Sequence, residues 1–375
     1  MTISLLSEPV LLDAQTSLAT TTAGGLLSTA PPPIDQALAL AVATQQFGFS
    51  APVSRLSGER DSNFLLRSPT GSRVVLKFIN AAESAVETDF QISLLRHLLG
   101  RGARDFTPHH VPALSGADWV EVRGQDGGVY RARAYSFLEG NPAARAPASS
   151  ALRLALGHTL AVFDDAVSDF VHPGIDRVFL WDVMHLNLLK SHVIHIDDVS
   201  LRENADRFID VFAQSIRPAL ANVRCQPIHN DLSQSNFVVK ESDPTLVAGV
   251  LDFGDMTHAP LVCDLAIAAS YQMADAPIPL QALHDVTEGF ELVTPLQDVE
   301  REHLLDLVLA RIVQRLVITE WRASQFPENR SYILRHNPQA RRLLSELEPV
   351  WRQQSRHGRD AARLASLSTS NASRP

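Results

Sequence analysis

The pattern of apolar and polar positions changes along the chain. Up to about residue 138, short apolar runs alternate with polar turns rich in Gly and Pro, as in VSRLSGERDSNFLLRSPTGSRVVLKFI, WVEVR and VYRARAYSFLEG. Such runs predict strands joined in antiparallel hairpins. Apolar side chains recur at helical spacing in residues 34–48 and in ESAVETDFQISLLRHLLGRG. From residue 146 to about 351 the periodicity is mostly helical.

This change predicts an α+β fold with two lobes. We expect residues 33–138 to form an N-terminal nucleotide-binding lobe, with a five-stranded antiparallel sheet and one main helix. Residues 139–354 would form a mostly helical catalytic and substrate lobe. A chain of 375 residues with 45% apolar residues can bury two cores. The Ser-, Thr-, Ala- and Gly-rich residues 1–32 predict a disordered leader, and residues 355–375 predict a disordered tail.

Composition excludes several classes of function. A net charge of -9 and a pI of about 5.8 argue against a general nucleic-acid surface, which needs clustered Lys and Arg. The two cysteines indicate neither a disulfide framework nor a zinc site. No apolar run is long enough for a membrane helix, and the first residues lack the basic start of a secretory signal. We therefore expect a cytoplasmic protein, and nothing indicates a membrane or protein partner.

One stretch carries the strongest candidate chemistry. The segment IHNDLSQSNFVV contains His229, Asp231 and Asn236 in the order H-x-D-x4-N, and VAGVLDFGD ends a β-type run on Asp252. In phosphoryl transfer, one carboxylate receives the proton of the acceptor hydroxyl, while an Asn and a second carboxylate hold Mg²⁺ on the nucleotide phosphates. These residues could fill the three roles.

The N-terminal lobe supplies a candidate cation. Lys77 lies among apolar residues on the third predicted strand, where a kinase positions a lysine against nucleotide phosphates. The alternative is a lysine at a sheet edge with its ammonium in solvent. On the following helix, Glu87 or Gln91 could reach and orient Lys77. Both could instead be the polar margin of an amphipathic helix.

Two backbone segments are candidates for nucleotide contacts. The turn from Gly58 through Ser62 to Asn63 could offer N–H groups to phosphates, although a plain hairpin turn is the alternative. The extended chain from Ser136 to Leu138 could hydrogen-bond a purine edge with its alternating donors and acceptors.

Together these motifs resemble a known family. The GERDSNF turn, Lys77, the HNDLSQSN loop and LDFGDM with the downstream CDLA resemble the aminoglycoside phosphotransferase and choline kinase superfamily, which has a protein-kinase-like fold. The resemblance covers about residues 34–350. It is strongest to the hydroxylysine kinase group and to kinase-like domains fused to class-III aminotransferases.

The resemblance implies roles for residues of this chain. Asp231 would be the catalytic base, with His229 organising its loop, and Asn236 and Asp252 would bind Mg²⁺. Lys77 would contact the phosphates of ATP or GTP. Two positions depart from the family pattern: Asn230 replaces the usual Gly of the HGD loop, and Gln91 stands where many relatives have the acid that pairs with the lysine.

The resemblance also implies an amino-alcohol acceptor such as hydroxylysine. Homoserine, ethanolamine, choline or an aminoglycoside are alternatives, and a nucleotide-binding pseudokinase is the non-enzymatic one. A protein kinase is disfavoured because the chain has almost no room for an activation segment after Asp252. Asp255 and Asp182 are candidates to receive an ammonium group, and Trp181 to lie against it. Asp182 could instead cap a helix.

Two further residues near these motifs have open roles. Asp264 lies near the start of a predicted helix and could brace the catalytic loop. Arg311 lies within a broad apolar helix face, where it could be a structural pairing residue or a carboxylate binder.

Overall fold

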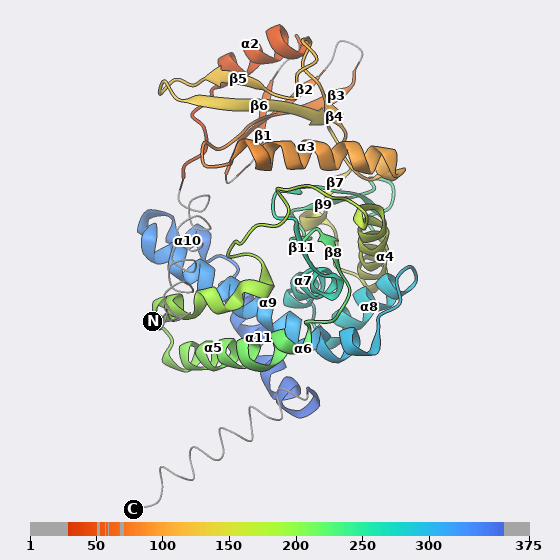
Figure 1. The fold of residues 1–375 in the computed structure, drawn as a ribbon, viewed down its shortest axis with the longest axis vertical. Coiled ribbons are helices and arrows are strands. Elements are labelled where there is room, and N and C mark those ends of the chain that lie inside the picture. Colours follow the sequence, from red (N-terminus) through yellow and green to blue (C-terminus); the bar gives the residue numbers. More distant parts are fainter. Residues whose placement is uncertain (1–28, 51–52, 57, 59, 68–70, 356–375) are drawn as a thin grey trace, which may run out of the picture. The chain divides into compact units, whose positions relative to one another are not determined.

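The computed structural model describes residues 29–50, 53–56, 58, 60–67 and 71–355. Most of the predicted leader and tail lies outside these residues. The chain divides into two compact units (Figure 1). The first comprises the chain up to Ile92, Pro108–Phe137 and Arg177–Leu180, and the second comprises Ser93–Thr107, Leu138–Asp176 and the chain from Trp181.

The first unit is built on an antiparallel sheet. Its strand order is β1-β2-β3-β6-β4, and β5 pairs with β6. The strands are β1 Ser54–Leu56, β2 Ser62–Arg67, β3 Arg73–Phe78, β4 His110–Val111, β5 Val120–Arg123 and β6 Val129–Ser136. The sheet therefore has six strands, whereas the sequence predicted five. The additional strand, β4, is only two residues long, which is too short to show a period-2 pattern.

Helix α2 (Gln36–Phe47) covers one face of this sheet, and α3 (Ala85–Gly100) begins on the other (Figure 1). The side chain of Asp35 accepts a hydrogen bond from the first turn of α2, and Gly48 ends the helix with φ 75°. A left-handed residue after a helix is most readily glycine, because glycine has no Cβ. The predicted helix boundaries are thus confirmed, and Ala39, Val42 and Phe47 pack into the core of the sheet.

The second unit is mostly helical (Figure 1). Its helices are α4 Ser150–Val167, α5 Val199–Val211, α6 Arg217–Ala219, α7 Leu261–Ala274, α8 Pro279–Glu291, α9 Asp298–Gln325, α10 Arg330–Ile333 and α11 Asn337–Gln354, with a π-turn over Phe212–Ile216 and 3-10 segments over Ala103–Asp105, Ala143–Arg145, Val183–His195 and Pro327–Asn329. Its short strands form two sheets: β7 (Asn141–Pro142) with β9 (Phe237–Val239) and β10 (Val247–Val250), and β8 (Cys225–Ile228) with β11 (Thr257–Pro260).

Helices α4 and α8 pack with their backbones in contact. A Cβ atom on Gly289 would lie 1.9 Å from the carbonyl oxygen of Leu154, and one on Gly157 would lie 2.0 Å from that of Val286. Only glycine permits this approach. Helix α7 packs against α8 and α9 and is buried along almost its entire length. It therefore provides a rigid base for the loops that precede it.

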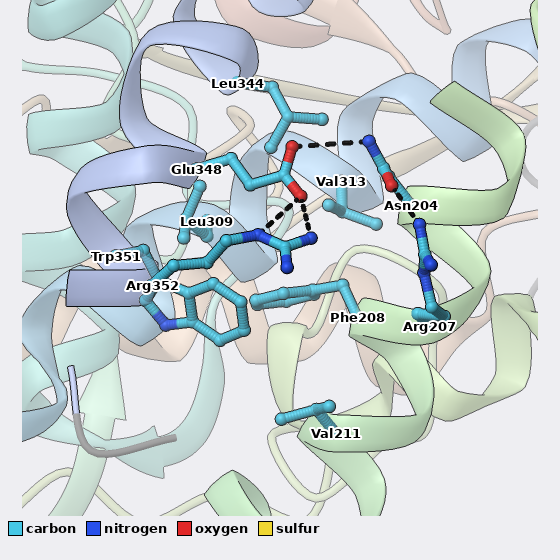
Figure 2. Close-up of a pocket in the computed structure, with 10 residues that line it drawn as sticks. All are labelled: Asn204, Arg207, Phe208, Val211, Leu309, Val313, Leu344, Glu348, Trp351 and Arg352. Atoms are coloured by element: carbon cyan, nitrogen blue, oxygen red, sulfur yellow. Dashed lines mark hydrogen bonds and ion pairs between the residues drawn. The ribbon is translucent and has the colours of Figure 1, made fainter. Parts of the chain in front are cut away.

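A pocket opens between α5, α9 and α11 (Figure 2). Phe208, Val313 and Trp351 contribute to its apolar wall. At its rim the Glu348 carboxylate accepts hydrogen bonds from Asn204 and from the guanidinium of Arg352. None of the motif residues lines this pocket. Among the described helices, none is both long and apolar enough to cross a bilayer.

Candidate active site

The loop between β8 and β9 carries the H-x-D-x4-N motif, and Asp264 holds its first residues. The carboxylate of Asp264, in the first turn of α7, is fully buried. Its two oxygens accept hydrogen bonds from the backbone N–H groups of His229 at 2.6 Å and Asn230 at 2.8 Å. Asp264 thus braces the loop. Hydrogen bonds to a carboxylate are among the stronger ones in proteins, so they fix the direction in which the chain leaves β8.

His229 acts on this loop from inside the core. Its side chain is fully buried, with ring centroids 5.6 Å from those of both Phe163 and Phe253. Its Nε2 lies 2.9 Å from the carbonyl oxygen of Leu251, and its Nδ1 accepts from the N–H of Asp231 at 3.3 Å. His229 therefore positions Asp231 and is enclosed by protein. This position fits the loop-organising role that the resemblance implies for His229.

Asn230 stands where the HGD pattern has glycine, and its conformation accounts for the replacement. Its backbone φ is 65°, in the left-handed region that asparagine tolerates better than most residues. Its side-chain amide donates to the carbonyl oxygens of Asp255 at 2.9 Å and Trp181 at 3.3 Å. Asparagine therefore adopts a backbone conformation that suits glycine and adds contacts that glycine lacks.

The carboxylate of Asp231 is held from three sides. Its Oδ1 accepts from the Tyr271 hydroxyl at 2.7 Å and from the Arg311 guanidinium at 2.9 Å, and its Oδ2 accepts from the Asn236 amide at 2.8 Å. The Asp231 side chain is 24% exposed, so part of it remains accessible. Burial raises the pKa of Asp231 above its ordinary value; the Arg311 guanidinium opposes this shift, and the Asp255 carboxylate adds to it.

Arg311 is a structural partner of Asp231. Its side chain is fully buried on α9. It donates to the carbonyl oxygen of Trp181 and to Gln314, both at 2.9 Å, and to the Tyr271 hydroxyl at 3.1 Å. Its guanidinium also lies 5.0 Å from the ring centroid of Trp181. The cation that Trp181 contacts in the structure is therefore Arg311, whereas the sequence assigned the indole to a substrate cation.

Tyr271 is a site residue that sequence reasoning missed. It lies on α7 seven residues after Asp264, about two helical turns along the same face. This spacing is the signal that could have found it, because Asp264 was already placed beside the catalytic loop. Burial raises the pKa of Tyr271, with the Arg311 guanidinium acting in the opposite direction. The phenol therefore stays protonated and donates to Asp231.

Asn236 and Asp252 fit a magnesium site. The amide nitrogen of Asn236 donates to both the backbone and the side chain of Asp231, each at 2.8 Å, which leaves its amide oxygen as a ligand. The N–H of Leu251 donates to the carbonyl oxygen of Asn236 at 2.8 Å, so the exposed Asp252 follows directly beside it. Mg²⁺ prefers oxygen ligands and usually binds one or two carboxylates together with substrate phosphates. The chemistry of this pair therefore suits the ion.

The two acidic residues predicted to receive a substrate ammonium differ. Asp182 is buried and caps the 3-10 segment Val183–His195: it accepts from the N–H of Met184 at 2.9 Å and lies 2.8 Å from Nδ1 of His185. The alternative of a cap is the one observed, so Asp182 is corrected to a structural role. Asp255 is only partly buried, and its charge acts on both Asp231 and Arg311. It stays a candidate.

In the first unit, Lys77 forms an ion pair with Asp61. The Lys77 ammonium lies 2.8 Å from the Asp61 carboxylate, and Asn80 donates its N–H to the same carboxylate at 2.8 Å. Burial acts to raise the pKa of Asp61, but the Lys77 charge and these hydrogen bonds outweigh it, and the net shift is downward. Asp61 belongs to the GERDSN turn. The turn therefore positions the lysine, a role that the sequence assigned to α3.

The two residues expected to orient Lys77 have other partners. Gln91 receives a hydrogen bond from the Arg133 guanidinium and donates to Glu83 at 3.3 Å. Glu87 pairs with Arg177 at 3.0 Å and accepts from the N–H of Ser84 at 2.7 Å. The expected pairing of Lys77 with Glu87 or Gln91 is therefore corrected to Asp61. The uncharged Gln91 suits this position, since its amide oxygen accepts from the Arg133 guanidinium and its amide nitrogen donates to the Glu83 carboxylate.

The predicted phosphate turn is compact. A Cβ on Gly58 would lie 2.6 Å from the Asn63 side chain, so the two residues are in close contact. The Ser62 hydroxyl is buried and donates to the carbonyl oxygen of Pro32 at 2.7 Å. Any nucleotide contact of Ser62 would therefore have to come from its backbone.

Two backbone N–H groups of the predicted purine-binding segment already form hydrogen bonds within the protein. The N–H of Ser136 donates to His109 and that of Phe137 donates to Arg73. The side chain of Leu138 occupies the space where a Cβ on Gly249 would lie. The hydrogen-bonding of a purine by this segment stays a prediction.

Comparison with known proteins agrees with this geometry. The model of the phosphotransferase enzyme family matches residues 52–301. The chain belongs to this family. It is 28% identical to a hydroxylysine kinase of Danio rerio, across 82% of this chain and 89% of the relative, and 28% identical to one of Mus musculus, across 82% and 87%. The protein is accordingly a kinase, an enzyme that phosphorylates a hydroxyl group.

Solved structures confirm the protein-kinase-like fold. A microcompartment-associated aminopropanol kinase matches with a TM-score of 0.64 at 19% identity, across 83% of this chain and 98% of that one. An amicoumacin kinase, solved in complex with AMP-PNP, Ca²⁺ and Ami, matches with a TM-score of 0.61 at 15% identity, across 80% of this chain and 93% of that one. The fold predicted from the motifs is thereby confirmed.

Proposed function

We propose that this kinase transfers the γ-phosphate of ATP or GTP to the hydroxyl of a hydroxy amino acid of the hydroxylysine type. The observation that carries the proposal is the Asp231 carboxylate, which Tyr271, Arg311 and Asn236 hold in place while part of it stays accessible. The similarity to hydroxylysine kinases over most of both chains supports the acceptor class. In this proposal residues 33–138 form the nucleotide-binding lobe and residues 139–354 the catalytic and substrate lobe.

Asp231 would accept the proton of the acceptor hydroxyl. Its Oδ1 is occupied by the Tyr271 hydroxyl and the Arg311 guanidinium, and Asn236 binds one position on Oδ2. A carboxylate oxygen has two lone pairs, so Oδ2 can still accept a hydrogen bond from an incoming hydroxyl. As that oxygen attacks the γ-phosphorus in line, the proton would move to Asp231. No covalent enzyme intermediate is required.

Asn236, Asp252 and Lys77 would serve the nucleotide. Asn236, through its amide oxygen, and Asp252, through its exposed carboxylate, would hold Mg²⁺. When bound, Mg²⁺ supplies positive charge that neutralises the phosphate oxygens during transfer. Lys77 would place its ammonium against the phosphates, and the ion pair with Asp61 keeps that ammonium in one position.

Asp255 would take an ammonium group of the acceptor. It lies close enough to Asp231 for its charge to contribute to the raised pKa of that residue. A carboxylate near the base attracts a cationic amine and so brings the neighbouring hydroxyl to Asp231. The hydroxylysine kinases and the aminopropanol kinase to which this chain is similar are named for acceptors that carry an amine, which agrees with this assignment.

A phosphate-transfer screen tests the proposal. The purified protein would be assayed with Mg²⁺ and either ATP or GTP against hydroxylysine, homoserine, ethanolamine, choline and an aminoglycoside. We expect hydroxylysine to be phosphorylated with the highest kcat/KM, and the product to disappear in Asp231→Asn. Preferred phosphorylation of choline or an aminoglycoside would overturn the acceptor class. Nucleotide binding without transfer to any acceptor would instead favour a pseudokinase.

A further inference from the structure

A second arginine lies against Tyr271, the residue that donates to the Asp231 carboxylate. Arg315 is on α9, four residues after Arg311, and residues at this spacing lie on the same face of a helix. Its guanidinium lies 4.5 Å from the ring centroid of Tyr271, the residue whose hydroxyl donates to Asp231. The side chain of Arg315 is half-buried, so its charge is accessible from outside.

The charge of Arg315 lacks a counter-ion among the described residues. Arg311 forms an ion pair with Asp231, but within the described chain Arg315 makes no ion pair or hydrogen bond through its guanidinium. Two like charges four residues apart on a helix repel each other. An anion beside Arg315 would relieve this repulsion. The guanidinium also presents donors in a fork that matches a carboxylate or a phosphate, so the carboxylate of an amino acid is an anion that it can bind through two hydrogen bonds.

The distance from Arg315 to Asp231 suits a short amino acid. The contacts of Tyr271 with each of them limit the separation of the guanidinium from the Asp231 carboxylate to about 10 Å. In an extended hydroxylysine chain, the hydroxyl oxygen and the carboxylate carbon are roughly 6 Å apart, and a hydrogen bond at each end brings the fully stretched span to about 12 Å. The acceptor would therefore bind with its chain partly bent, or with its hydrogen bonds at an angle to the chain, to fit within about 10 Å. A hydroxy amino acid can thus place its hydroxyl at Asp231 and its carboxylate at Arg315 together.

We propose that Arg315 binds the α-carboxylate of the acceptor and so selects hydroxy amino acids over amino alcohols that lack a carboxylate. The inference rests on the proposed function and narrows its substrate class. Tyr271 joins the two ends of this subsite, because its ring supports the Arg315 guanidinium and its hydroxyl holds Asp231. Arg315 is thus a specificity-determining residue, and Arg311 is the partner of the base.

Matched pairs of acceptors test this assignment. Hydroxylysine would be compared with its decarboxylated diamine, and homoserine with the corresponding aminopropanol. Each pair keeps the hydroxyl and an amine and differs in the carboxylate. For the wild-type enzyme we expect kcat/KM to be roughly 10- to 100-fold higher for the acid than for its partner, the range expected for one charge-assisted interaction.

Arg315→Met should remove this preference. We expect its KM for the acid to rise until the two members of a pair are used about equally, while kcat/KM for the amino alcohols and KM for the nucleotide stay at wild-type values. Arg315→Lys, which keeps the charge but loses the fork, should retain part of the preference. Arg335→Met is a matched control, because Arg335 also lies over a tyrosine ring, that of Tyr332 at 3.8 Å.

The outcomes separate the two proposals. If wild type phosphorylates these acceptors and Arg315→Met keeps the same preference for acids, or loses activity equally on both members of a pair, Arg315 does not bind the carboxylate. In that case the proposed function stands. A wild-type protein that phosphorylates none of the acceptors would overturn the proposed function and this inference with it.

Discussion

The guanidinium of Arg311 lies 2.9 Å from Oδ1 of Asp231, and its side chain is 1% exposed. A buried arginine thus directly contacts the carboxylate assigned as the catalytic base. The pair is reinforced by Tyr271, which bonds to both residues. Burying the Asp231 carboxylate without this cation would be costly, since the charged form loses its hydration.

Arg311→Met should therefore damage catalysis more than nucleotide binding. Without the guanidinium, Asp231 loses its counter-ion and one of its fixed hydrogen bonds, so we expect kcat to fall roughly 100-fold and the free energy of unfolding to drop by about 3 kcal/mol. Steady-state kinetics and urea unfolding measure the two effects. Arg352→Met, which breaks the ion pair at the pocket rim, serves as a control that should leave kcat unchanged. A wild-type kcat in Arg311→Met would show that Asp231 functions without its partner.

Asp61→Asn should impair nucleotide use through Lys77. The Asp61 carboxylate holds the Lys77 ammonium at 2.8 Å, and an amide keeps the shape but loses the charge. We expect KM for the nucleotide to rise roughly 10-fold. Glu87→Ala should leave that KM near wild type, because Glu87 pairs with Arg177 instead. A larger rise in the nucleotide KM for Glu87→Ala than for Asp61→Asn would contradict this account and assign the orientation of Lys77 to Glu87.

Asp164→Asn should become relatively more stable than wild type as the pH rises. Burial raises the pKa of Asp164 well above its ordinary value, and the nearby Asp264 carboxylate adds to the shift. A raised pKa in the folded state means that the stability contributed by the protonated group is fully present below the unfolded pKa of about 3.9 and is lost as pH rises through the folded pKa. Asparagine is always neutral, so it avoids this loss. Urea unfolding at pH 5, 7 and 9 measures the difference in unfolding free energy between Asp164→Asn and wild type. A difference that does not change with pH would contradict the account.

Asn230 should tolerate glycine and reject valine. A backbone φ of 65° is available to glycine, whereas a β-branched side chain is strained there. We expect Asn230→Gly to keep kcat within roughly 10-fold of wild type, losing only the side-chain bonds to Asp255 and Trp181. Asn230→Val should lose about 2 kcal/mol of stability and most of its activity. Thermal unfolding and kcat decide between these outcomes, and equal behaviour of the two variants would show that φ is unimportant at this position.

How far the sequence predicts this site depends on whether a contact is local. The H-x-D-x4-N loop and Asp252 lie in one short stretch, and helical or strand periodicity placed α2 and the hairpins correctly. Tyr271 and Arg311 contact Asp231 across 40 and 80 residues, so local periodicity does not assign either of them to Asp231 as a partner. The sequence assigned the partner of Lys77 to the following helix, but in the structure Lys77 pairs with Asp61, which lies in the turn before β2. Helix and strand periodicity identifies elements, whereas side-chain pairs depend on how those elements pack.

The proton acceptor is the centre of the account, and Asp231→Asn tests it most directly. The substitution keeps the shape of the side chain but removes its ability to take a proton, so we expect phosphate transfer to hydroxylysine to fall by roughly 10²–10⁴-fold. Binding of the magnesium nucleotide, measured by calorimetry on the same variant, should stay close to wild type, because Asn236, Asp252 and Lys77 are unchanged. Turnover of Asp231→Asn at the wild-type rate would contradict the assignment of Asp231 as the base.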